Sequence, residues 1–127
     1  MRGLLDTSVF IGDEQGRAIA ADRLPDEAAI SVVTVAELEL GVHMSTSAEV
    51  RARRLQTLLS AQSTYVALPI DEHVASAFAE LVASARRNRR RARVQDAWIA
   101  ATAHAHGVAV YTKDDHFDAF PIDVARV

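Results

Sequence analysis

Short apolar runs alternate with stretches of helical periodicity along the whole chain, and this alternation limits the possible folds more than any other feature. Apolar, β-rich runs cover residues 3–5, 29–33, 64–68 and 108–111, and an edge strand is expected near Val124. Strands that alternate with helices favour a parallel sheet, because each connection must cross back to the starting edge. The sequence therefore predicts a layered α/β fold with a mainly parallel sheet.

The helical stretches are recognised by apolar residues spaced three and four apart. We expect a helix that opens at Thr34 and ends near Gly41, and helices over 48–59 and 97–105. A further helix is expected to begin at an Asp71 cap and to end in an arginine-rich stretch. A short turn or helix through residues 117–120 is expected to lead to the edge strand.

Composition narrows the class of protein. The 127 residues are 50% hydrophobic, which suits one domain over 1–127, and the sequence has no internal repeat or long linker. No apolar run approaches the roughly 18 residues of a membrane span, and acidic residues follow the start too closely for a signal peptide. A cytoplasmic location is expected, although the sequence does not exclude secretion. The absence of cysteine excludes thiolate metal sites and thiol nucleophiles, so any metal must bind oxygen or imidazole.

Charge is distributed unevenly, although the net charge is only −3. Residues 1–50 carry nine acidic and three basic side chains, residues 51–93 carry nine arginines and three acids, and residues 94–127 carry five acids and two bases. A basic centre between two acidic ends is the pattern expected if carboxylates gather a metal and arginines hold a phosphate chain beside it.

Four acids occupy positions where strands end or helices begin. Asp6 and Asp114 follow predicted strands, and Glu37 and Asp96 are expected in the first turns of helices. In parallel α/β sheets such positions meet outside the carboxyl ends of the strands. Carboxylates crowded together repel one another, and a bound divalent cation would offset that repulsion. A cluster of acids therefore indicates a metal site. Ligands that are all oxygen favour Mg²⁺ or Mn²⁺.

Each acid also has a purely structural interpretation. Asp6 is suited to cap the following helix, and Glu37 forms a Thr-x-x-Glu capping box with Thr34. Asp96 and Asp114 suit the positive end of a helix dipole. Taken one at a time the two interpretations are about equally good, and only the joint placement of all four favours a site.

Four segments that contain these acids follow one another along the chain. They are residues 5–11 (LDTSVFI), residues 31–38 (SVVTVAEL) with Gly41, residues 96–103 (DAWIAATA) and residues 112–117 (TKDDHF). In this order they resemble the first, second, third and fourth motifs of PIN-domain nucleases of the VapC-like toxin type. The matches spread over nearly the whole chain.

The resemblance implies a three-layer α/β/α fold with a central, mainly parallel sheet of four to five strands, and RNA cleavage that depends on Mg²⁺ or Mn²⁺. It carries the roles of metal ligand and catalytic acid to Asp6, Glu37, Asp96 and Asp114. Asp115 beside Asp114 leaves open which one is the fourth ligand. It further implies that the chain is the toxin of a type II toxin-antitoxin pair, with a VapB-like antitoxin and a homodimeric state.

Arginines are concentrated just before the third motif, where many relatives are less basic. This arginine segment consists of Arg86, Arg87, Arg89, Arg90, Arg91 and Arg93. Phosphates of RNA would relieve its self-repulsion and give salt-sensitive affinity. A solvated basic loop and a contact with an acidic protein partner are the alternatives. Thr112 and His116 are accessory candidates at the acids, Thr112 for orienting the fourth acid or a water and His116 for contacting substrate.

Other functions remain to be compared. A phosphoaspartate receiver domain normally has an acidic pair after its first strand, and a haloacid dehalogenase-like phosphatase needs a second aspartate two residues after the first, where Ser8 stands. A degenerate PIN domain that only binds RNA or a partner, and a PIN nuclease of RNA processing, remain as alternatives to a toxin nuclease.

Overall fold

The computed structural model describes residues 2–127, in which five strands alternate with helices. The strands are β1 (Arg2–Leu5), β2 (Glu27–Ser31), β3 (Ala67–Leu68), β4 (Ala109–Thr112) and β5 (Val124–Arg126). The α-helices are α1 (Thr7–Glu14), α2 (Val32–His43), α3 (Ala48–Thr64), α4 (Glu72–Arg87) and α5 (Val94–Ala105). Two short 3-10 helices are η1 (Ala21–Arg23) and η2 (His116–Ala119).

The strands form one sheet in the order β3-β2-β1-β4-β5, and every neighbouring pair is parallel. The predicted mainly parallel sheet is thus confirmed, as is the edge strand near Val124. The register places Leu5, the last residue of β1, opposite Tyr111 near the end of β4. The carboxyl ends of these two central strands therefore lie side by side, and α1 begins directly beyond β1.

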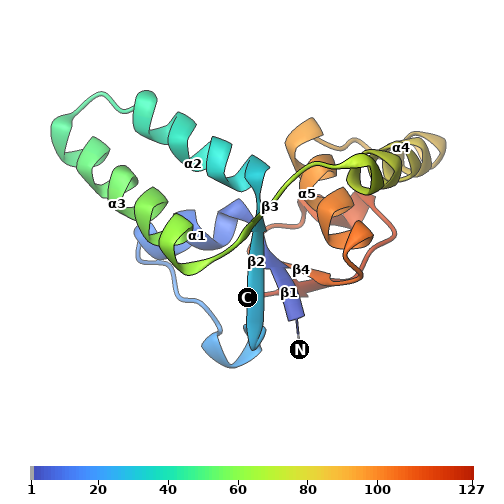
Figure 1. The fold of residues 1–127 in the computed structure, drawn as a ribbon, viewed down its shortest axis with the longest axis horizontal. Coiled ribbons are helices and arrows are strands. Elements are labelled where there is room, and N and C mark those ends of the chain that lie inside the picture. The colour runs from blue at the N-terminus through green and yellow to red at the C-terminus, as the bar shows by residue number, and fades with distance from the viewer. Residues whose placement is uncertain (1) are drawn as a thin grey trace.

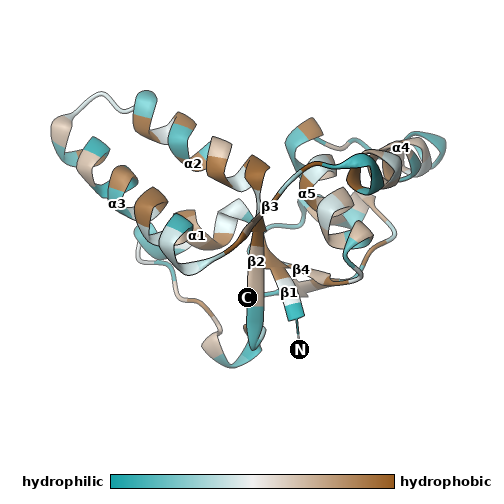
Figure 2. Ribbon diagram, in the orientation of Figure 1, coloured by the Kyte–Doolittle hydropathy of each residue, from teal (hydrophilic) through white to brown (hydrophobic). Residues whose placement is uncertain are grey.

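Helices cover both faces of the sheet, as Figure 1 shows: α1, α2 and α3 lie on one side, and α4 and α5 on the other. Two buried clusters correspond to these faces. One joins Leu4 and Val110 to α4 and α5, and the other joins Leu5 and Ile30 to α2 and α3. Successive strand residues point to opposite faces, which is why Leu4 and Leu5 enter different clusters. Figure 2 shows apolar and hydrophilic residues alternating along α2, α3 and α4, as surface helices require.

Two sequence predictions about boundaries were wrong. The helix expected over 48–59 continues to Thr64, so β3 is only Ala67–Leu68 and begins later than expected. The second strand ends at Ser31, which caps α2 by accepting a hydrogen bond from the Val33 amide. Thr34 is therefore inside α2, and Glu37 lies in its second turn instead of its first. The predicted capping box does not form.

Other boundaries agree with the sequence. Asp71 caps α4 through the Val74 amide, and α4 ends at Arg87 within the arginine segment, as predicted. Helix α5 begins three residues earlier than expected, which places Asp96 in its first turn. Within residues 2–127, no helix combines the length and the apolar character that crossing a bilayer requires.

Candidate active site

Asp6 links the central strand to the first helix at the carboxyl end of the sheet. Its backbone amide donates to Tyr111 O (2.9 Å), which continues the β1–β4 pairing, and its side chain caps α1 by accepting from the Ser8 amide (3.3 Å). The residue is only 2% exposed. The structural role considered for Asp6 is therefore real, and it fixes the carboxylate where a site can form.

Hydrogen bonds hold the Asp6 carboxylate in place. Thr112 Oγ1 donates to Asp6 Oδ2 (2.9 Å), and the Ser8 and Thr112 hydroxyls lie 3.1 Å apart. Burial raises the pKa of Asp6, because the charged form is poorly solvated. The hydrogen bonds from Ser8 and Thr112 oppose that rise, whereas the negative charge of Asp96 adds to it. The hydrogen bonds thus fix the orientation of the Asp6 carboxylate, but they only partly offset the cost of burying its negative charge.

Glu37 reaches the same place from α2. Thr7 Oγ1 lies 2.8 Å from Glu37 Oε1 and 3.0 Å from Thr34 Oγ1, so the start of α1 is tied to α2. Burial is the main reason why the pKa of Glu37 is raised, and the negative charges of Asp6 and Asp96 raise it further. Three of the four predicted acids therefore influence one another electrostatically.

Asp96 and Asp114 complete the group from α5 and from the loop after β4. Asp96 is 4% exposed, and Asp114 is half-buried. His116 Nδ1 lies 3.6 Å from Asp96 Oδ2 and 3.4 Å from Asp114 Oδ2, so this imidazole stands between the two carboxylates. Asp115 is exposed and precedes η2 without capping it. This placement favours Asp114 over Asp115 as the fourth acid.

Arg93 lies among these acids. Its Nε donates to Asp96 Oδ2 (3.0 Å), and its Nη2 lies 2.7 Å from His116 Nδ1. The hydrogen bond and charge of Asp96 raise the pKa of Arg93, and Glu37 and Asp114 contribute in the same direction. One cation thus interacts with three of the four carboxylates.

The donor set suits a hard divalent cation, because it consists of carboxylate oxygens, and the neighbouring negative charges help to raise the pKa of Asp6 and of Glu37. Within the described residues 2–127, however, no three Asp, Glu or His side chains are already placed to bind one metal ion together. The carboxylates converge without closing into a ligand shell, and the Arg93 guanidinium lies beside them.

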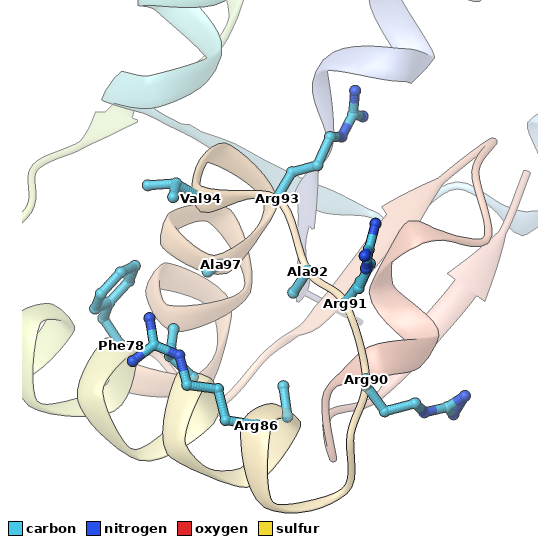
Figure 3. A pocket seen from close by; sticks show the side chains of 10 residues that line it. Phe78, Arg86, Arg90, Arg91, Ala92, Arg93, Val94 and Ala97 are labelled. Atoms are coloured by element: carbon cyan, nitrogen blue, oxygen red, sulfur yellow. The ribbon is translucent and has the colours of Figure 1, made fainter.

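The rest of the arginine segment lies at the surface beside this group. Arg86 and Arg87 form the last turn of α4, and Arg89, Arg90 and Arg91 follow it, all exposed. A cavity of about 480 Å³ lies between α4, this segment and the start of α5, with an apolar floor that includes Phe78, Val82 and Ala97. Figure 3 shows that Arg93, on the border of this cavity, points away from Phe78. Arg93 therefore differs from its neighbours, because it is turned to the acids.

The sequence interpretation missed the hydroxyl residues that support the acids. Thr7 holds Glu37, and Ser8 accepts from the Lys113 amide (3.0 Å) while lying beside Thr112. Thr7 and Ser8 are the two residues after Asp6 in the sequence, and this adjacency is the signal from which their supporting role could have been predicted. Thr112 was selected, and its hydroxyl also accepts from the Asp114 amide (3.0 Å), so it orients both Asp6 and the loop that carries Asp114.

A comparison with protein families matches residues 3–122 to the PIN domain. The chain belongs to the PIN-domain family. Among curated proteins, this PIN domain is 43% identical to Ribonuclease VapC5 of Mycobacterium tuberculosis, with 98% of this chain and 95% of that protein covered. It is 47% identical to Ribonuclease VapC4 of the same organism, with 94% and 92% covered.

Solved structures agree with this assignment. The PIN domain superposes on a chain of the VapBC-5 toxin-antitoxin structure from Mycobacterium tuberculosis with a TM-score of 0.89 at 38% identity, covering 99% and 97% of the two chains. A chain of the FitAcB structure from Neisseria gonorrhoeae gives a TM-score of 0.78 at 30% identity, covering 96% and 95%. The predicted PIN-like fold is confirmed.

Proposed function

We propose that this PIN domain is a metal-dependent endoribonuclease and the toxin of a VapBC-type toxin-antitoxin pair. The single observation that carries the nuclease proposal is the convergence of Asp6, Glu37, Asp96 and Asp114 beyond the carboxyl edge of the sheet. The relatives named as VapC ribonucleases, similar over nearly their whole length, support RNA as the substrate. PIN nucleases generally depend on a divalent metal, and the oxygen donors here suit Mg²⁺ or Mn²⁺.

Asp6, Asp96, Glu37 and Asp114 would hold the metal. When bound, Mg²⁺ or Mn²⁺ supplies an activated water and neutralises charge that develops on the scissile phosphate. The protein's own contribution is orientation. Thr112 and Ser8 fix Asp6, and Thr7 fixes Glu37. The site therefore needs no protein nucleophile, which agrees with the absence of cysteine.

Glu37 is the best candidate to accept the proton of the attacking water. Thr7 binds its Oε1, so Oε2 remains available, and its raised pKa is nearer to that of an efficient base at neutral pH. Water oxygen then bonds to phosphorus, the bond to the leaving oxygen breaks, and the leaving oxygen takes a proton from solvent. Asp96 is the alternative base, but its Oδ2 is engaged by Arg93.

The exposed arginines give this site a surface for the RNA backbone. Arg86, Arg87, Arg89, Arg90 and Arg91 offer positive charge beside the acids, and phosphate contacts bind RNA without regard to sequence. His116 lies between Asp96 and Asp114, where it can also contact substrate. We propose that the RNA chain crosses this arginine surface as it enters the acidic site.

The toxin assignment brings further proposals. A VapB-like antitoxin would bind the chain and block the acidic site, since the solved relative VapBC-5 is a toxin-antitoxin pair. We also propose a homodimer formed through helical faces. A cytoplasmic location fits a nuclease that meets cellular RNA and is held inactive by a partner protein.

A PIN domain that only binds RNA or a partner is the competing function. All four acids are present, and hydroxyl groups support Asp6, Glu37 and the loop of Asp114, which favours catalysis. A PIN nuclease of RNA processing shares the chemistry and differs only in target.

Incubation of the purified protein with total cellular RNA, with and without Mg²⁺, tests the proposal. We expect new RNA ends to appear only with Mg²⁺, and mapping these ends identifies the target. Asp6→Asn should abolish the cleavage while leaving the circular dichroism spectrum unchanged. Equal cleavage by parent and variant would exclude the assigned site, and the absence of cleavage with intact RNA binding would favour the binding-only function.

A further inference from the structure

Arg93 occupies an unusual place for a member of a surface arginine segment. It immediately precedes α5, and its backbone is extended, but its side chain makes no capping bond to that helix. Instead its guanidinium binds Asp96 Oδ2 and reaches His116, although the Arg93 side chain is 63% exposed. An exposed arginine that turns toward a buried carboxylate is held there by the charge of the acids.

The acids need such a cation when no metal is bound. Asp6 and Asp96 are almost fully buried, and their like charges repel across the site. Neither Lys113 nor the rest of the arginine segment supplies the balancing charge. Lys113 Nζ is engaged by the backbone carbonyls of Ala18 and Val127, and Arg90 donates to Asp118 O. Among the described residues, only Arg93 forms an arginine or lysine ion pair with one of the four acids.

We infer that Arg93 is a resident counter-ion of the catalytic acids. Its guanidinium pairs with the Asp96 carboxylate in the metal-free protein and is displaced when a divalent cation binds. This inference rests on the proposed metal site and adds a regulation of that site. Asp96 Oδ2 cannot give its full charge to a metal while it accepts from Arg93. The two cations therefore compete for one carboxylate.

The exposed position of Arg93 makes the exchange possible. Its guanidinium can leave Asp96 without disturbing the core, because the side chain lies mostly in solvent. The competition also accounts for a group of acids that converge but do not form a ready ligand shell within residues 2–127.

Calorimetric titration of metal-free protein with Mn²⁺, compared between the parent and Arg93→Gln, tests the inference. Removing the competing cation should tighten Mn²⁺ binding by about five- to tenfold, equivalent to roughly 1–1.4 kcal/mol. The melting temperature in EDTA should fall for Arg93→Gln, and its rise on addition of Mn²⁺ should exceed that of the parent. A merely structural arginine would lower both melting temperatures equally.

Arg91→Gln is the matched control for metal affinity. Arg91 stands two residues away, is exposed and, among the described residues, pairs with none of the four acids. Arg91→Gln makes the same charge change without removing a contact to the acids, so it should leave Mn²⁺ affinity nearly unchanged. Unchanged or weaker binding by Arg93→Gln, or equal tightening by Arg91→Gln, would overturn the inference.

A second measurement uses the unaltered protein. In the parent without metal, the Arg93 Nε–H should give an NMR signal that is protected from exchange with solvent. This protection should be lost on titration with Mg²⁺. Persistent protection with bound Mg²⁺ contradicts the displacement. If the parent binds no Mn²⁺, or if Asp6→Asn binds it equally well, the proposed metal site itself fails, which is a different result from equal binding by Arg93→Gln.

Discussion

At the scale of single residues, Asp6 meets two opposing demands. As the cap of α1 and a buried acid at the end of β1, it is held in a fixed place. The same burial disfavours its negative charge and raises its pKa. Binding sites commonly retain groups that cost the folded protein stability, because function needs them charged and oriented.

The raised pKa of Asp6 predicts a pH dependence of stability. When the folded-state pKa of an acid exceeds its unfolded-state value, the folded state binds more protons between the two values, so stability falls as pH rises through that window. The window begins at the ordinary value of 3.8 and extends upward. Urea unfolding in EDTA, from about pH 4 to about pH 7, should therefore show the parent losing free energy of unfolding relative to Asp6→Asn.

Divalent metal provides the control for this experiment. Saturating Mg²⁺ should stabilise the ionised carboxylates at the proposed site, so the loss in the parent should be reduced or reversed. If the parent and Asp6→Asn show parallel pH profiles in EDTA, burial does not perturb Asp6 in the expected direction.

Thr112 is a positioning residue for two of the acids. Thr112→Val keeps the shape of the side chain but removes the donor to Asp6 and the acceptor for the Asp114 amide. Supports of this kind change metal affinity or activity by about 10- to 100-fold. We expect Mg²⁺-dependent cleavage to fall at least about tenfold, with a loss of roughly 1–3 kcal/mol in stability from unpaired buried groups.

Thr102→Val is the matched control for Thr112→Val. Thr102 is equally buried, but its hydroxyl donates to Trp98 O within α5, away from the acids. It should change stability without a specific loss of cleavage. Similar cleavage losses in both variants would show that Thr112 acts only through stability.

At the scale of elements, the end of α4 explains why the arginine segment leaves the helix. The Arg90 amide donates to Ala85 O (2.8 Å), and the Arg89 amide donates to Arg86 O (3.1 Å). This pattern is a Schellman cap, in which the residue after the helix adopts a left-handed conformation. Arg89 holds that position with φ of 54°, where glycine is usual.

Arg89→Gly should stabilise the protein. A left-handed conformation costs an ordinary residue roughly 1–2 kcal/mol, part of which glycine loses again through its freer unfolded chain. The expected net gain is about 0.5–1 kcal/mol, measured by urea unfolding. Arg87→Gly, inside the last turn of α4, removes the same side chain and should instead cost about 1 kcal/mol. Destabilisation by both variants would contradict the strain assigned to Arg89.

The start of helix α2 differs from the sequence prediction because another residue caps it. The sequence predicts that the helix opens at Thr34, because Glu37 follows three residues later and completes a Thr-x-x-Glu pattern. The structure uses Ser31, and Thr34 is fully buried and bonded to Thr7 instead. A capping box is a local pattern, whereas the contact between α1 and α2 depends on residues 27 positions apart.

At the scale of the whole molecule, the uneven charges along the chain are folded into one neighbourhood. Acids from both ends of the sequence meet at the carboxyl edge of the sheet, and the arginine segment runs beside them into α5. Backbone phosphates would meet the arginines before the scissile bond reaches the acids. Affinity for RNA should therefore depend strongly on salt.

Neutralising two surface arginines tests this arrangement. In an Asp6→Asn background that does not cleave, Arg86→Gln/Arg91→Gln should reduce the slope of log affinity against log salt by about 1.4, because each phosphate contact in single-stranded RNA contributes roughly 0.7. Fluorescence anisotropy with a labelled single strand measures the slope. Arg51→Gln/Arg53→Gln on α3 removes equal charge elsewhere and should change the slope much less. Equal effects of the two pairs would indicate long-range attraction only.

The sequence by itself determined the alternation of strands and helices and the parallel sheet, and it selected the four acids proposed as the site, because these depend on local periodicity and on residues that follow strands directly. Residues such as Asp6, Thr112 and Asp114 could be selected from their positions along the chain. The extension of α3 into a predicted strand, the true cap of α2 and the supports from Thr7 and Ser8 could not. Only the tertiary structure decided that Arg93 turns to Asp96 while the other arginines of the segment do not pair with the four acids, since that choice depends on charges brought together by packing distant segments.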